Sequence, residues 1–190
     1  MNLHDPSVKV TSADEALQYL KEGNARFMKG DLSVKDNYSD IRGALSGGQK
    51  PFAIILCCAD SRVAPEIYFD QKLGDIFVIR NAGNVVDDVV LGSIEYGAEH
   101  LGSPLVVVVG HTSCGAVTAA VEGGHVPPNI EAIVKKIHPS VGSGKAVNEV
   151  AKINAKAMAE QIAADEIIKH LGTKVIAAVY DITSGEVEWC

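Results

Sequence analysis

The sequence has no long hydrophobic run. Even the continuous apolar stretch at 105–109 stops at Gly110, whereas a membrane-spanning helix needs about 20 apolar residues. The opening residues, 1–6, have neither the basic segment nor the apolar segment of a secretory signal. We therefore expect a cytoplasmic protein that does not enter a membrane.

Basic residues are also few. The chain has 17 Lys and Arg against 24 Asp and Glu, a formal net charge of −7. Binding to nucleic acid or to an anionic membrane surface would need a basic patch or stripe, so we expect neither partner. No GxGxxG follows a predicted strand, and the segment from Gly142 to Lys145 lacks the spacing of a phosphate-binding loop. A nucleotide-binding module is therefore disfavoured, although it stays open as an alternative.

Cysteine is scarce. The chain has four: Cys57, Cys58, Cys114 and Cys190. In a reducing compartment thiols stay free, so these are better interpreted as metal ligands, nucleophiles or core residues than as a disulfide framework. Cys57 and Cys58 are neighbours on a predicted strand and should point to opposite faces of it. We expect Cys57 to be a small buried apolar residue.

Length and composition fit one domain of residues 1–190, with an N-terminal helical arm (1–50) and an α/β core (51–190). Helical spacing and caps predict helices from Ser12 to near Gly30 and over 86–101, 115–122, 129–137 and 148–171. Apolar or β-branched runs predict strands over 52–56, 75–80, 105–109, 174–180 and 186–189. The alternation predicts an α/β fold with four parallel strands, an antiparallel edge strand and flanking helices.

Two of the predicted strands end in metal-binding residue types. The first ends at Cys58, and the third ends at His111 and leads through Cys114 into a helix. Ligands of open α/β sheets bind at the carboxyl ends of strands, so these three side chains can converge if the strands are neighbours. Two thiolates and an imidazole suit Zn²⁺ and leave a fourth position open, which is typical of a catalytic site. A structural site would need a fourth ligand, for which Cys57 and Asp60 are candidates.

Asp60 and Arg62 follow the first strand and are two residues apart. The guanidinium can pair with the carboxylate and keep it ionised. Alone, such a pair would be interpreted as a surface salt bridge of little energetic value. Beside a three-ligand metal site, it predicts a functional carboxylate.

The run from Cys58 through Asp60 to Arg62, together with the His-Thr-Ser-Cys run from His111 to Cys114, resembles the β-class carbonic anhydrases. The likeness continues through 74–84 and 92–96 and covers nearly the whole chain. It implies that Cys58, His111 and Cys114 hold zinc. It further implies that a hydroxide on this zinc, oriented by the Asp60–Arg62 dyad, hydrates carbon dioxide to bicarbonate and a proton.

The resemblance also implies a substrate pocket and an assembly. The residues it assigns to substrate binding are Gln49, Phe77, Ala82 and Tyr96. Because some of these come from the neighbouring subunit in the family, it implies a homodimer or a larger even-numbered homo-oligomer. Two alternatives remain open beside the nucleotide module: a hydrolase of carbonyl sulfide or carbon disulfide at the same site, and a zinc protein without catalytic activity.

Overall fold

The computed structural model describes residues 9–33, 38–142 and 146–190. Residues 1–8 and most of the loop predicted at 142–145 lie outside these ranges. The strands are β1 (Ala53–Cys58), β2 (Ile76–Asn81), β3 (Leu105–His111), β4 (Lys174–Tyr180) and β5 (Val187–Trp189). They form one sheet in the order β2-β1-β3-β4-β5, in which only the β4–β5 pair is antiparallel. The predicted fold class is confirmed.

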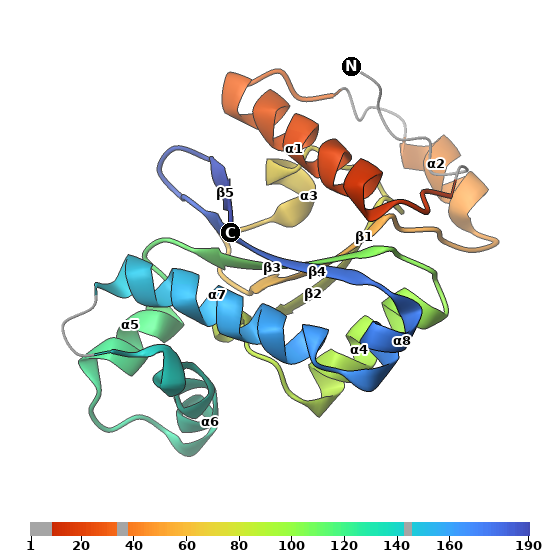
Figure 1. Ribbon diagram of the computed structural model, residues 1–190. Helices are drawn as coiled ribbons and strands as arrows, with labels where there is room; N and C mark the ends of the chain where they lie inside the picture. Colours follow the sequence, from red (N-terminus) through yellow and green to blue (C-terminus); the bar gives the residue numbers. More distant parts are fainter. Residues whose placement is uncertain (1–8, 34–37, 143–145) are drawn as a thin grey trace.

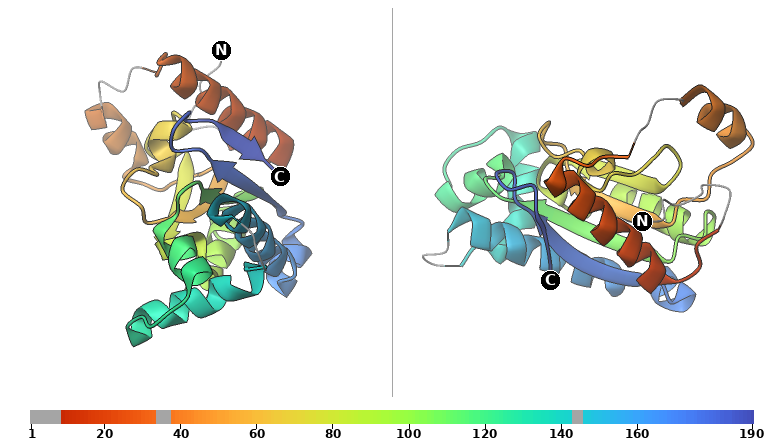
Figure 2. Two further views of the ribbon diagram at one scale, coloured as in Figure 1. Left: turned by 90° about the vertical axis from the view of Figure 1, so that its left-hand side faces the viewer. Right: turned by 90° about the horizontal axis from the view of Figure 1, so that it is seen from above.

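Helices cover both faces of the sheet. They are α1 (Ala13–Lys29), α2 (Tyr38–Leu45), α3 (Pro65–Tyr68), α4 (Asp88–Glu99), α5 (Gly115–Glu122), α6 (Pro128–Ile137), α7 (Val147–Ala163) and α8 (Glu166–Leu171), with 3-10 turns η1 (Ala82–Asn84) and η2 (His138–Ser140). Figure 1 shows α1 and α3 on one face and α4, α7 and α8 on the other, with α5 and α6 beyond one end of α7. Seen from above, α1 crosses over the sheet (Figure 2).

Strand β1, which lies between β2 and β3, is buried along its whole length. Its alternate side chains enter two separate cores, because successive residues of a strand point to opposite faces. Cys58 belongs to the core under α4, α5 and α7. Cys57 belongs to the core under α1 and α3 and is fully buried. The prediction that the two cysteines separate, with Cys57 as a packing residue, is confirmed.

The N-terminal helix begins and ends as predicted. The Ser12 side chain accepts a hydrogen bond from the backbone N–H of Glu15, and Gly30 ends the helix in the left-handed conformation. Polar contacts attach α1 to the core: the Arg26 guanidinium lies 2.6 Å from the buried Asp70 carboxylate. The polar, glycine-bearing segment at 31–50 predicts a loop with a short helical turn at most, and its described part contains the helix α2.

The helix predicted over 148–171 is two helices, so this boundary was wrong. Helix α7 ends at Ala163, and α8 starts after Asp165, whose Oδ1 accepts hydrogen bonds from the amides of Ile167 and Ile168. The apolar spacing continues across the break, so it does not show the break. Asp165 is the N-cap signal that could have located it.

Within the described residues, no helix is both long enough and apolar enough to cross a membrane.

Candidate metal site

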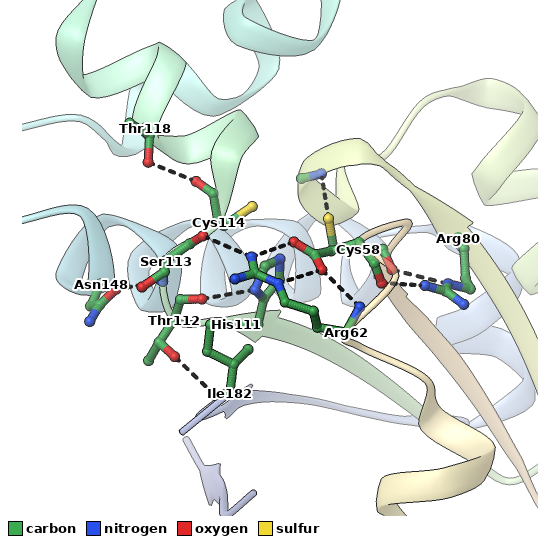
Figure 3. A network of polar contacts seen from close by, with 12 residues as sticks. Cys58, Arg62, Arg80, His111, Thr112, Ser113, Cys114, Thr118, Asn148 and Ile182 are labelled. Atoms are coloured by element: carbon green, nitrogen blue, oxygen red, sulfur yellow. Dashed lines mark hydrogen bonds and ion pairs between the residues drawn. The ribbon is translucent and has the colours of Figure 1, made fainter. Parts of the chain in front are cut away.

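The three predicted metal ligands come together at the carboxyl ends of β1 and β3. These strands are adjacent and parallel in the sheet. Cys58 is the last residue of β1, His111 is the last residue of β3, and Cys114 is the N-cap of α5. All three are buried, and their ligand atoms lie within 4.8 Å of one another. Figure 3 shows the three side chains facing a common centre.

The imidazole of His111 is oriented for metal binding. Its Nδ1 lies 2.9 Å from the backbone oxygen of Thr112, which can only accept, so the ring carries its proton on Nδ1 and has a lone pair on Nε2. That Nε2 atom is buried and has no hydrogen-bond partner in the described chain. A buried, unpartnered lone pair is costly in a protein interior, and a metal ion between the three side chains would satisfy it.

The two thiols shift each other's pKa in opposite directions. A hydrogen bond from the Cys114 thiol lowers the pKa of Cys58 well below its usual range, against the opposite effect of burial. The same hydrogen bond, together with burial, raises the pKa of Cys114. The Gly83 amide donates to Cys58 Sγ at 3.4 Å. The lowered pKa of Cys58 favours its thiolate, the form in which cysteine binds metal.

Asp60 and Arg62 form the predicted dyad beside this cluster. Oδ1 of Asp60 accepts from the backbone N–H and from Nε of Arg62, each at 2.9 Å, and Oδ2 accepts from Nη2 at 2.7 Å. These bonds hold the pKa of the Asp60 carboxyl well below its usual range. Arg62 also reaches the backbone oxygen of Ser113, 3.5 Å away (Figure 3). The dyad thus bridges the two loops that carry the metal ligands.

Two further polar residues hold those loops, and we predicted no role for either of them from the sequence. Arg80 donates from Nε to the backbone oxygen of Cys58 at 3.0 Å and from Nη2 to that of Asp60 at 2.7 Å. Asn148, in the first turn of α7, accepts from the Ser113 amide at 2.8 Å. Ser113 has a positive φ of 55°, which is unfavourable for a side-chain-bearing residue. An arginine at the exposed end of β2 was the only sequence signal for these contacts.

Comparisons with known proteins show which family the chain belongs to. A model of the carbonic anhydrase family matches residues 53–187. The chain belongs to the β-class carbonic anhydrases. Carbonic anhydrase 2 of Mycobacterium tuberculosis is 50% identical over 139 residues, covering 71% of this chain and 67% of that protein. A carbonic anhydrase of Mycolicibacterium smegmatis is 40% identical over 187 residues, covering 91% of each chain. The solved β-carbonic anhydrase CafA of Aspergillus fumigatus superimposes with a TM-score of 0.72 at 25% identity, covering 93% and 89% of the two chains.

The residues that the β-class resemblance assigns to substrate fall into two groups. Ala82 lies at the metal site, because it directly follows Asn81, which pairs with Cys58, and precedes the Gly83 amide that contacts the sulfur. The other three lie elsewhere in the same chain. Phe77 pairs with Ile54, four residues before Cys58, which is about 13 Å along the strand.

Gln49 and Tyr96 are also remote from the metal ligands of their own chain. Gln49 precedes the amino end of β1, whereas the metal site is at the carboxyl end. It lines a cavity of about 430 Å³ together with Arg42, Leu45 and neighbouring residues. The Tyr96 ring, on α4, lies 6.2 Å from the Phe77 ring and is 48% exposed. A single copy of this β-carbonic anhydrase chain therefore does not bring all the predicted site residues together.

Proposed function

We propose that this protein catalyses the reversible hydration of carbon dioxide to bicarbonate and a proton, at a zinc ion held by Cys58, His111 and Cys114. Membership of the β-class family supports this reaction. The observation that carries the proposal is local: a buried, unpartnered histidine nitrogen lies within 4.8 Å of two thiol sulfurs and beside a paired Asp–Arg dyad. A purely structural zinc site would have no use for that dyad.

The donor set fits zinc. Thiolate sulfur and imidazole nitrogen are ligand types that Zn²⁺ prefers. Cys58, His111 and Cys114 bring two sulfurs and one such nitrogen together. Three protein ligands leave one tetrahedral position for water. Zinc in such a position supplies a nucleophile by lowering the pKa of the water it binds.

Asp60 orients the attacking water in this proposal. Because Arg62 keeps the carboxyl ionised, Asp60 is a hydrogen-bond acceptor at neutral pH. An acceptor at this place fixes the direction of the water's O–H bond and thus turns its lone pair toward the carbon of carbon dioxide. Arg62 engages both carboxylate oxygens, which also keeps Asp60 from occupying the open metal position.

We further propose that the active unit is at least a homodimer in which Gln49, Phe77 and Tyr96 complete the site of the neighbouring chain. The separation of these residues from Cys58 within one chain supports this arrangement. The outer edge of β2 has no strand partner in the described chain, and it lies beside the half-exposed Tyr96. An unpaired edge with exposed aromatic surface is typical of an interface between chains.

We also propose a cytoplasmic location. All four cysteines are unpaired in the structure, which supports a reducing compartment.

The test combines metal analysis with an assay of carbon dioxide hydration on the purified protein. We expect one zinc per chain and hydration well above the uncatalysed rate. Cys58→Ser should lose both zinc and activity, because it removes a thiolate ligand. Cys190→Ser, which changes the exposed terminal cysteine, is the matched control and should keep both. A zinc-loaded protein without hydration activity would contradict the proposal, and a parallel assay with carbonyl sulfide would then test the alternative substrate.

A further inference from the structure

Helix α7 carries a buried amide that faces the metal-site region. Asn154 is fully buried within the apolar side of this helix. Its Nδ2 donates to the backbone oxygen of Gly83 at 3.0 Å, whereas its Oδ1 has no hydrogen-bond partner in the described residues. The apolar spacing at 148–171 predicts a buried side formed by Val150, Ile153, Ala157, Ile162 and Ile168. Ile153 and Ala157 are only partly buried, whereas the other three are buried.

An asparagine is a poor choice for this position if packing is its only task. Burying an amide with an unsatisfied oxygen destabilises a fold, and an apolar side chain of similar volume avoids that cost. The neighbouring buried positions of the helix, Val150 and Met158, are apolar. The contact of Asn154 with Gly83 is therefore the feature that the asparagine provides and a leucine cannot.

Gly83 belongs to a turn that needs external support. Its φ is 77°, and the next residue, Asn84, has a φ of 45°, so two successive residues adopt left-handed conformations that are costly outside glycine. A Cβ at Gly83 would approach Ile137 Cδ1 to 2.8 Å and Ala116 Cβ to 3.2 Å. In this conformation the Gly83 amide points at Cys58 Sγ, 3.4 Å away (the sulfur is labelled in Figure 3).

We propose that Asn154 is a positioning residue for the metal site. It holds the Gly83 carbonyl, and this keeps the Gly83 amide directed at the sulfur of Cys58. A hydrogen bond to a ligand sulfur draws electron density away from it, so the contact adjusts how strongly Cys58 donates to the metal. The inference rests on the proposed metal site and adds to it a residue 96 positions along the chain from Cys58 (154 minus 58).

The experiment uses cobalt(II), which reports directly on its sulfur ligands. The full chain is loaded with cobalt, and the sulfur-to-cobalt charge-transfer band is compared between the unaltered protein and Asn154→Leu. We expect the band to move to longer wavelength in Asn154→Leu, because the sulfur loses its amide donor and is more easily oxidised. Zinc affinity, measured by competition with a chelator, should fall by about 10-fold, because the turn beside Cys58 is no longer held in place. Thermal stability of the metal-free protein should change little, because removal of the unpartnered Oδ1 offsets the lost hydrogen bond to Gly83.

The matched control is Met158→Leu. Met158 lies one helical turn further along α7. Its Sδ accepts a hydrogen bond from the amide of Val86, in the segment that joins η1 to α4. Among the described residues its hydrogen bond is to Val86 and not to Gly83 or Cys58, so the band of Met158→Leu should stay in place. If Asn154→Leu does not fold, Asn154→Ala removes the same donor without adding bulk.

An unmoved band in Asn154→Leu, or an equal shift in Met158→Leu, would overturn the inference and leave Asn154 as a packing residue. The proposed function fails separately: a chain that shows a normal thiolate–cobalt band and no carbon dioxide hydration would refute the function and leave the role of Asn154 testable by its band shift.

Discussion

The carboxylate of Asp60 is held in place by the guanidinium of Arg62. Both carboxylate oxygens accept from Arg62, which leaves Asp60 ionised beside the metal ligands. We expect Asp60→Asn to retain one zinc per chain but to hydrate carbon dioxide about 10- to 100-fold more slowly, because the amide lacks the charge and can present a donor to the water. Metal analysis and stopped-flow hydration measure the two effects.

The control for that substitution is Asp87→Asn. Asp87 caps α4 by accepting from the Val90 amide at 2.8 Å, and asparagine caps helices equally well. Its hydration rate should match that of the unaltered protein. Full activity in Asp60→Asn, or loss of zinc from it, would refute the orienting role.

The buried thiol of Cys57 should make the stability of the protein depend on pH. Burial raises the pKa of its thiol to about 12, from an ordinary value of 9.0. Above pH 9 the unfolded chain releases this proton while the folded chain keeps it. The stability that this group contributes is therefore complete below pH 9 and is lost as the pH rises toward 12, with a slope of about 1.4 kcal/mol per pH unit.

Urea unfolding of Cys57→Val at pH 8, 9 and 10 tests this assignment. Valine is of similar size and does not ionise, so the variant should lose less stability than the unaltered protein between pH 9 and 10, by about 1 kcal/mol. Equal pH dependence in the two proteins would mean that the Cys57 thiol is not protected by burial.

On the scale of helices and strands, what could be predicted depended on whether the signal is local. The strands were predictable because β1 and β3 are continuous runs of apolar residues, buried on both faces. The cluster of Cys58, His111 and Cys114 could be predicted because two such strands end in cysteine and histidine. The contact between Asn154 and Gly83 was not predictable, because it joins residues far apart in the sequence through a turn whose conformation no short pattern specifies. The break at Asp165 was missed because the apolar spacing of α7 continues into α8.

The break between α7 and α8 leads to a prediction about stability. Asp165 caps α8 with two hydrogen bonds to backbone amides, so Asp165→Ala should lower the free energy of unfolding by about 1 kcal/mol. Asp165→Asn should restore most of the loss. Because α8 lies away from the metal ligands, hydration activity of both variants should be unchanged at temperatures below unfolding. A reduced activity in Asp165→Ala without a change in stability would contradict the assignment of a capping role.

Across the whole molecule, the predicted site residues lie in two separate places. Cys58, His111, Cys114 and Asp60 lie at the carboxyl edge of the sheet, whereas Gln49 precedes the amino end of β1. If Gln49 binds substrate, as we propose, one chain carries two half-sites that do not meet. A two-fold axis relating two chains would place each half-site against its complement, since a symmetric dimer uses the same surface of both chains.

This arrangement can be tested by mixing two inactive chains. One variant carries Cys58→Ser and keeps Gln49 and Phe77, and the other carries Gln49→Ala with Phe77→Ala and keeps its metal ligands. Each alone should have little activity. If the half-sites combine across the interface, a mixed dimer has one intact site. The purified mixed dimer should then show about one half of the activity of the unaltered protein.

The two variants are co-expressed with different affinity tags, and the doubly tagged dimer is purified before the hydration assay. Mixed dimers that are no more active than the separate variants would show that Gln49 and Phe77 serve their own chain. A control pairing Cys58→Ser with Cys114→Ser should remain inactive, because both substitutions damage the same half-site. Recovery in the first mixture and not in the second would assign the metal ligands to one chain of each active site and Gln49 with Phe77 to the other.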